Sequence, residues 1–379
     1  MKIAFAMWST ARTGGTNSIF NVADRLAKLG HEVRIISLGA KNHTWFKFKR
    51  DIHFYYPEEK LLSHLWIKFR NRRLGTIELL DWVLRKIHIN LFIDRCKILS
   101  EALNEYARDA DAVIATYFET AFSVNRMNSE KCKKFYYIQH IESFFFNDVY
   151  NKKRVHETYF LPFKWMISSS WANSKLVELT GKIGNIVIPG IDTSVYYPRH
   201  IDKNKNYKII VSLGKSMNIK GLKFLFEALN KVSRQISNIK LILYGVEPSL
   251  RMISPVTTEY IISPTNDRLA ELYSIADVMV TPSLYESSPS PPIEAMACGA
   301  PVVTTKFGTE DYCFDGENSL VVPPEDADAL AEAILRVLSD SNLASKLREN
   351  GLRKSKELSW DSTAQNFEKV LLKTIGQNL

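Results

Sequence analysis

The sequence predicts an α/β protein made of two Rossmann-like, doubly wound domains. Its 379 residues exceed what one hydrophobic core usually organises, so two domains are expected. Short apolar runs alternate with helical patterns along the chain, as in open parallel sheets covered by helices. This alternation stops at residues 191–206, which are rich in charge and proline, and then resumes. The two series therefore predict one sheet on each side of a linker.

The first domain is expected over residues 1–190. It opens with a strand at 2–7 ("KIAFAM"), followed by a helix that runs to Leu29 and ends at Gly30, where glycine tolerates the left-handed backbone of a helix end. Four further apolar runs are predicted strands, at residues 32–37, 111–117, 134–139 and 184–190. Together these segments form successive βαβ units.

The second domain is expected over residues 207–358. Its predicted strands lie at residues 208–214, 239–245, 259–263, 276–283, 300–305 and 318–324, with helical patterns between them. The last segment, 359–379, has an amphipathic pattern from about Asp361 to Ile375, which predicts a closing helix.

Composition and cysteine content indicate the class of protein and its cellular location. With 45% hydrophobic and 24% charged residues, a disordered or fibrous protein is excluded. Four cysteines without metal-type or redox spacing are typical of reduced thiols, and the opening apolar run is too short for a signal peptide. No apolar run reaches membrane-spanning length. We therefore expect a cytoplasmic location.

The net charge of +9 is concentrated in region 41–100, which has 13 Lys or Arg against 6 Asp or Glu, interleaved with aromatic residues. Such a pattern is typical of a helix on an anionic membrane surface, so peripheral contact with the inner face of the membrane is one expectation. The alternative is a solvated basic helix whose aromatic residues lie in the domain core. No nucleic-acid-binding motif accompanies the charge, so a nucleic-acid partner is not expected.

Ligands of open α/β sheets bind at the carboxyl ends of the strands, so the loops after the strands are the candidate sites. After the first strand, Gly14 and Gly15 precede a helix, where backbone amides favour an anion, although a plain tight turn explains them equally. After strand 208–214, Gly214 and Lys215 are followed by Lys220. Two cations five residues apart in such a loop suit a diphosphate.

A third loop, in "YESSPSPPIEAMACGAPVV", joins the strand at 276–283 to a helix that stops at Gly299. Prolines in the first helical turn leave the helix start aimed at the loop, where its dipole favours an anion. Glu286 and Glu294 flank this position. Because a carboxylate beside an anion site needs hydroxyl partners, the loop predicts a site for a nucleotide sugar.

This stretch resembles the signature of retaining glycosyltransferases of family four, which have the GT-B fold of two Rossmann-like domains facing a central cleft. Further matches follow in the family's order: "GGTNSIFNVADRLAKLGHEVRII", "VSLGKSMNIKG", "LAELYSIADVMVTPS" and "LVVPPEDADALAEAI". The resemblance covers nearly the whole chain and is clearest over residues 207–340. It also implies that the closing helix crosses back to the first domain.

The resemblance implies a role for each matched residue. Lys215 and Lys220 are expected to neutralise the donor diphosphate, Glu294 to bind the ribose, and Glu286 to contact the transferred sugar. Gly14 and Gly15 are expected to pack against the donor. His140, after "KFYYIQ", matches a histidine close to the transferred sugar, although a strand-end histidine is more often structural.

The implied activity is transfer of a hexose or deoxyhexose from a nucleotide-diphosphate sugar to a glycan or lipid-linked acceptor, with retention of anomeric configuration, in polysaccharide or glycolipid synthesis. The aspartate pairs Asp109/Asp111 and Asp326/Asp328 are explained by a turn and by helix capping, so neither a metal nor another cofactor is expected. A sugar-nucleotide epimerase, a phosphorylase and a catalytically weak binding subunit are the alternatives.

One departure from the family pattern concerns the donor. Ser287, Ser288 and Pro289 stand where the family commonly has Gly-Phe-Gly. The hydroxyls of Ser287, Ser288 and Ser290 can supply hydrogen bonds to the donor, but Pro289 removes a backbone amide. The nucleotide base and the sugar are therefore not predicted.

Overall fold

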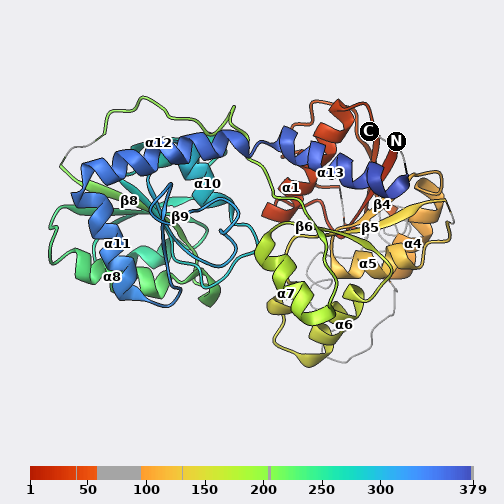
Figure 1. Cartoon of the computed structure of the whole chain (residues 1–379), viewed down its shortest axis with the longest axis horizontal. Helices are drawn as coiled ribbons and strands as arrows, with labels where there is room; N and C mark the ends of the chain where they lie inside the picture. Colours follow the sequence, from red (N-terminus) through yellow and green to blue (C-terminus); the bar gives the residue numbers. More distant parts are fainter. Residues whose placement is uncertain (40, 58–94, 130, 204–205, 377–379) are drawn as a thin grey trace, which may run out of the picture. The chain divides into compact units, whose positions relative to one another are not determined.

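The computed structural model describes residues 1–39, 41–57, 95–129, 131–203 and 206–376 (Figure 1). The chain divides into two compact units: one made of Met1–Ile167, Leu176–Asn185 and Ala364–Leu379, the other of Ser168–Lys175 and Ile186–Thr363. These bounds differ from the expected domains. Residues 168–175 belong with the second unit, and so does the segment 191–206, which the sequence analysis treated as a linker. Residues 186–190 and 359–363 also fall in the second unit.

The first unit contains a seven-stranded sheet in the order β3-β2-β1-β4-β5-β6-β7, and the pairs from β3 to β6 are parallel. The strands are β1 (Lys2–Met7), β2 (Glu32–Ser37), β3 (His53–Tyr55), β4 (Ala112–Ala115), β5 (Lys133–Ile138), β6 (Lys164–Ile167) and β7 (Asn185–Ile186). Strands β3 and β6 were not predicted, and β7 is shorter than the predicted strand at residues 184–190. The missed strands have only three and four residues, whereas β1 is a continuous buried apolar run from Ile3 to Met7.

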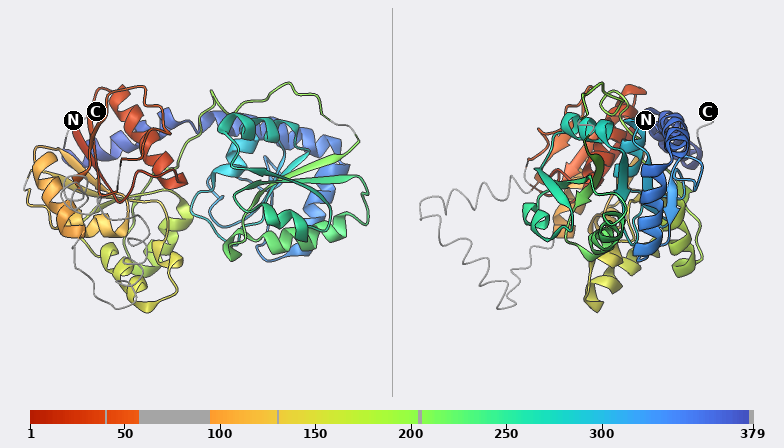
Figure 2. Two further views of the ribbon diagram at one scale, coloured as in Figure 1. Left: turned by 180° about the vertical axis from the view of Figure 1, so that it is seen from behind. Right: turned by 90° about the vertical axis from the view of Figure 1, so that its left-hand side faces the viewer.

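Helices cover the first sheet (Figures 1 and 2). They are α1 (Gly14–Lys28), α4 (Arg95–Tyr106), α5 (Phe118–Asn125), the 3-10 turn η2 (Glu142–Phe145), α6 (Val149–Tyr159) and, with their first residues in the second unit, α7 (Ser170–Thr180) and α13 (Trp360–Ile375). The closing helix α13 forms where its pattern predicted it. Its Phe367 packs against Phe5 and Tyr137, which lie on two strands of this sheet.

An aromatic cluster around Phe20 of α1 concerns region 41–100, for which we expected either a helix on a membrane surface or a solvated basic helix with its aromatic residues in the domain core. Phe20 of α1 is fully buried and lies within 6.0 Å, between ring centroids, of Trp45, Phe46, Phe48 and Phe54. These four aromatic side chains are partly buried and pack against the core of the first unit through Phe20. Residues 58–94 of this region, including the predicted surface helix, lie outside the described residues.

The second unit contains a six-stranded parallel sheet in the order β10-β9-β8-β11-β12-β13. Its strands are β8 (Lys208–Gly214), β9 (Ile239–Gly245), β10 (Thr257–Ile262), β11 (Val278–Thr281), β12 (Val302–Thr305) and β13 (Leu320–Val322). All six lie within or next to the predicted runs. Each strand could be predicted from its apolar run, because both faces of a parallel sheet are buried.

Two helical layers enclose the second sheet. The elements are η3 (Asn218–Lys220), α8 (Leu222–Val232), η4 (Pro248–Ile253), α9 (Asn266–Ile275), α10 (Ser290–Ala297), α11 (Ala327–Ser339) and α12 (Ser341–Glu357). One core cluster joins α8 and α11 to the sheet through residues such as Leu225 and Ile334, and another joins α9 and α10 through Tyr273 and Met296. The chain thus has two doubly wound α/β units, as the sequence predicted.

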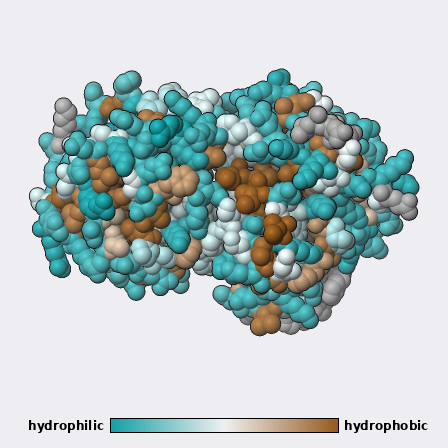
Figure 3. Space-filling model, in the orientation of Figure 1, coloured by the Kyte–Doolittle hydropathy of each residue, from teal (hydrophilic) through white to brown (hydrophobic). Residues whose placement is uncertain are grey.

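Most of the face shown in Figure 3 is hydrophilic, with hydrophobic side chains gathered in several patches. All four cysteines are buried and unbridged. Among the helices that the structure describes, none combines the length and the hydropathy needed to span a bilayer.

Candidate nucleotide-sugar site

The candidate site of the second unit lies where its strand order reverses. The chain runs outward from β8 to β10 and then returns to β11, which pairs with the other side of β8. Loops that leave two such neighbouring strands go to opposite faces of a sheet and leave a crevice at the carboxyl ends. The loops after β8 and β11, which carry Lys220 and Glu286, therefore meet at this position.

Lys220 and Glu286 form an ion pair, although 66 positions separate them in the sequence. The Glu286 carboxylate is buried, with 7% of the residue exposed, and its Oε1 accepts from both Lys220 Nζ and Ser283 Oγ, the latter at 3.0 Å. In the described parts of the chain, Oε2 receives no hydrogen bond. A buried carboxylate held in this way has one oxygen fixed and the other available to a hydroxyl group.

Two glycines allow the loops around this pair to approach closely. Gly221 follows Lys220 with φ +64°, and a Cβ there would lie 1.8 Å from the carbonyl oxygen of Pro282. Gly308 has φ +93°, and a Cβ there would lie 2.1 Å from the carbonyl oxygen of Glu286. Main-chain hydrogen bonds join the same segments, from Leu284 N to Ile219 O at 2.8 Å and from Glu286 N to Phe307 O at 3.1 Å. The loops that contain Gly221, Pro282 and Gly308 therefore contact one another around Glu286.

The helix α10 begins at Ser290, shortly after Glu286, and has prolines in its first turn as predicted. Ser290 is exposed, Ser288 is partly exposed, and Ser287 is only 1% exposed. The Ser287 hydroxyl is buried without a hydrogen-bond partner among the described residues. The three serines named as donor contacts therefore lie at different depths, and their contacts with a donor stay predictions.

Glu294 lies one turn into α10 beside a group of tyrosines. The Tyr273 hydroxyl donates to Glu294 Oε2 at 3.4 Å, and Tyr273 and Tyr244 hydroxyls lie 2.8 Å apart. Hydrogen bonds from Ser290 and Tyr196 also favour the charged form, but burial dominates and raises the pKa of Glu294 to about 7. These tyrosines were not predicted as site residues because they come from three segments that are distant in the sequence, and each lies in an ordinary apolar pattern.

Gly214 ends strand β8, and Lys215 follows it. A Cβ on Gly214 would lie 2.7 Å from the ring of Tyr260, and the Tyr260 hydroxyl donates to Gly214 O at 2.8 Å. Gly214 thus makes room for a neighbouring side chain within the unit. Lys215 is partly exposed and has no salt bridge to a carboxylate in the described chain. Its ammonium group is therefore available to an anion at the strand end.

Three predicted residues lie in the first unit. Gly14 and Gly15 begin α1, which Thr13 caps by accepting from Thr16 N at 3.1 Å. A Cβ on Gly15 would lie 3.4 Å from Gln139 Oε1, whereas Gly14 faces open space. His140 follows β5, is partly buried and contacts the ring of Phe145 at 5.2 Å between centroids. Gly15 and the strand end before His140 are thus neighbours within this unit.

Each predicted aspartate pair has partners that explain it. Asp109 binds Lys2 and Arg34, and Asp111 accepts from the backbone N of Lys2 at 2.7 Å. Asp326 caps α11 by accepting from Ala329 N at 2.9 Å. Within the described ranges, His, Cys, Asp and Glu side chains form no cluster of three or more that would suit a metal ion.

Glu142 is a buried carboxyl that the sequence analysis did not single out. It lies two residues after His140, accepts from Phe118 N at 2.7 Å at the start of α5, and from the Tyr136 hydroxyl at 3.3 Å. Burial raises the pKa of Glu142 to about 8. Glu142 therefore anchors the loop that carries His140 to the first helical turn of α5.

A raised pKa in the folded state makes stability depend on pH. Below the unfolded pKa, near 4.5, Glu142 is neutral in both states, and above it the unfolded chain releases the proton first. The contribution of Glu142 is therefore lost as the pH rises toward about 8, at up to about 1.4 kcal/mol per pH unit. We expect Glu142→Gln to reduce the fall in urea-unfolding free energy between about pH 5 and about pH 8. The exposed control Glu101→Gln should follow the wild type, and equal slopes for Glu142→Gln and wild type would contradict the assignment.

The comparisons with known proteins agree with this geometry. Residues 207–340 match the family model described as "Glycosyl transferases group 1". The MMP alpha-(1->4)-mannosyltransferase of Mycolicibacterium hassiacum is 30% identical over 203 residues, which are 50% of this chain and 49% of that protein. The chain spans about half the length of the curated relatives it matches.

Two solved structures are similar over nearly the whole chain. Anabaena Alr3699/HepE, in complex with UDP and glucose, has a TM-score of 0.75 at 15% identity and covers 98% of this chain and 100% of its own. Sucrose-phosphate synthase of Thermosynechococcus elongatus has a TM-score of 0.73 at 20% identity, over 99% of each chain. At these sequence identities the similarity is evidence for a shared fold alone. The chain therefore has the GT-B fold, and its residues 207–340 match the glycosyl transferases group 1 family.

Proposed function

We propose that the protein is a glycosyltransferase that moves a sugar from a nucleotide-diphosphate donor to a glycan or lipid-linked acceptor. The observation that carries the proposal is the Lys220–Glu286 pair at the switch point of the second sheet. Lysine has three N–H donors, of which Glu286 occupies one, so two are available to a diphosphate. The group 1 family match and the similarity to a mannosyltransferase support the same reading.

The donor's parts are assigned by charge and hydrogen-bonding capacity. Lys215 and Lys220, together with the backbone N–H of Ser290 and the N-terminal dipole of α10, would compensate the negative charge that develops on the leaving diphosphate. Glu286 Oε2 would accept from a hydroxyl of the transferred sugar, and Glu294 from the ribose. The resemblance also assigns His140, Gly14 and Gly15, which belong to the first unit, to contacts with the donor. Because lysines and a helix terminus supply the positive charge, we propose transfer without a metal.

Retention of anomeric configuration belongs to this proposal through the resemblance to family four. The leaving phosphate, held by the two lysines, would assist attack on the same face of the sugar. A similar structure was solved with UDP and glucose, which supports a nucleotide-sugar donor without identifying the base. Polysaccharide or glycolipid synthesis remains the predicted setting.

A thermal-shift panel tests the donor site first. We expect UDP, GDP, dTDP or ADP, with the matching sugars, to raise the melting temperature for one base. Binding at 100 times the dissociation constant stabilises the fold by about 2.7 kcal/mol. The shift should be the same in EDTA and in magnesium. A shift that requires magnesium would contradict the metal-free part, and no shift with any nucleotide would favour the binding-subunit alternative.

Product analysis separates the competing reactions. With the donor that gives the shift and a panel of glycan and lipid-linked acceptors, a transferase forms a glycosylated acceptor with the anomeric configuration of the donor. Isomerised donor without acceptor product would instead indicate an epimerase, and sugar released onto added phosphate would indicate a phosphorylase. An inverted product would overturn the retaining assignment.

A further inference from the structure

The helix α6 of the first unit exposes large apolar side chains. Val149, Tyr150 and Phe160, at or next to its ends, are 81%, 69% and 62% exposed. The 3-10 turn η2 just before it adds Phe144 and Phe145, at 45% and 49%. Single exposed apolar residues are ordinary, but five within one short segment mark an interaction surface.

The opposite side of α6 explains why these residues stay outside. Val155, Thr158 and Tyr159 are buried in the first unit, and the Asp148 side chain caps the helix by accepting from Asn151 N at 2.7 Å. The helix is therefore fixed in place by one buried face. Its other face can contact a partner without any change in the fold.

Positive charge accompanies the exposed apolar residues. Val149, Lys152, Lys153, His156 and Phe160 recur at intervals of three and four residues, which places them on one side of the helix. Neither lysine has a salt bridge to a carboxylate among the residues that the structure describes. The acidic side chains beside them are Glu157 and the cap residue Asp148, whose carboxylate interacts with Lys152; with Arg154 counted, residues 148–160 carry a net charge of +1.

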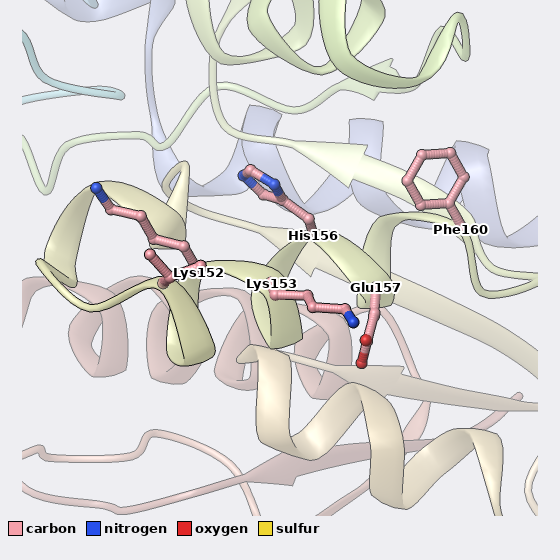
Figure 4. Close-up of a pocket in the computed structure, with 6 residues that line it drawn as sticks. Lys152, Lys153, His156, Glu157 and Phe160 are labelled. Atoms are coloured by element: carbon pink, nitrogen blue, oxygen red, sulfur yellow. The ribbon is translucent and has the colours of Figure 1, made fainter.

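These side chains surround a shallow hollow of about 460 Å³, lined by Val149, Lys152, Lys153, His156, Glu157 and Phe160. Figure 4 shows the hollow with the two lysines, His156 and Phe160 around it. An apolar floor with ammonium groups at its rim has the arrangement of an interfacial helix, in which apolar groups enter the acyl boundary and lysines reach the phosphates.

We propose that this face of α6 docks the protein on an anionic lipid bilayer. A nucleic acid would match the lysines but would leave Val149 and Phe160 in water, and an apolar protein partner would leave the lysines unneutralised. A bilayer with acidic headgroups matches both, because each lysine near such a surface contributes about 1 kcal/mol and each buried apolar side chain contributes further. This surface differs from the basic region 58–94, and its occupancy does not depend on the proposed transfer reaction.

Vesicle co-sedimentation of the full chain tests the proposal. The wild type should bind vesicles of phosphatidylcholine mixed with phosphatidylglycerol and not vesicles of phosphatidylcholine alone. We expect Lys152→Glu with Lys153→Glu to weaken binding by about tenfold or more. Val149→Ser with Phe160→Ser should weaken binding at high salt as well, since the apolar contribution is not screened.

Matched controls locate the effect. Lys346→Glu with Lys369→Glu changes the net charge by the same amount at exposed lysines of other helices. Ile183→Ser with Met252→Ser removes apolar side chains that are 82% and 78% exposed elsewhere. Both control pairs should bind like the wild type. Equal binding by the α6 variants and their controls, no binding by the wild type, or binding of a short DNA duplex in place of vesicles would overturn the proposal.

Discussion

Replacing Lys220 with alanine is expected to reduce sugar transfer by about 100- to 1,000-fold, the usual effect of removing one preorganised donor from a developing charge. The same change leaves the buried Glu286 carboxylate without its cation, and breaking a buried ion pair costs about 3–5 kcal/mol of stability. Activity and unfolding must therefore be measured together. Initial rates with the identified donor and urea-unfolding curves provide both.

A double-mutant cycle separates chemistry from folding. Glu286→Gln alone should also abolish transfer, because the amide replaces the charged oxygen that would face the sugar. The combination of Lys220→Ala with Glu286→Gln removes both charges, so most of the lost stability should return while activity does not. Lys231→Ala, in an exposed pair with Asp328, is the control and should leave both measurements unchanged within error. Full activity in either site variant would sink the assignment of Lys220 and Glu286.

Gly221→Ala is expected to be among the most damaging single-atom additions to the second unit. The new Cβ would lie 1.8 Å from the carbonyl oxygen of Pro282, and backbone cannot give way there as a flexible side chain would. The loop after β8 must then move, and Lys220, the preceding residue, moves with it. We expect a loss of several kcal/mol in the free energy of unfolding, beyond the strain of the left-handed backbone, and loss of the nucleotide-induced thermal shift.

Gly316→Ala is the matched control for this change. Gly316 has φ +67°, close to the +64° of Gly221, but nothing lies within 4 Å of its added Cβ. Its substitution should cost only about 1 kcal/mol, from backbone strain alone. The difference between the two variants in urea unfolding measures the clash with Pro282. Equal destabilisation would show that the loop adapts and that the close approach is unimportant.

Residue types near the candidate site could be predicted, but several of their neighbours could not. Lys220 and Glu286 could be predicted because they lie in loops at the carboxyl ends of predicted strands, and Glu294 because it lies in the first turns of the helix that follows one of these loops. Tyr196, Tyr244 and Tyr273 could not, because aromatic residues in apolar runs are typical of core positions. Glu142 was missed because a carboxyl near a strand end is ordinary until its burial is known.

The sequence by itself determined the alternation of strands and helices, the two series of strands and the residue types in the loops. Such features depend on local periodicity, because a strand buried on both faces must be apolar along its whole length. Only the tertiary structure decided that β8 lies beside β11, that Gly221 touches Pro282, and that Lys220 pairs with Glu286. These contacts depend on the order of the strands in the sheet and on close approach of backbone segments that are distant in the sequence. Neither can be predicted from local periodicity.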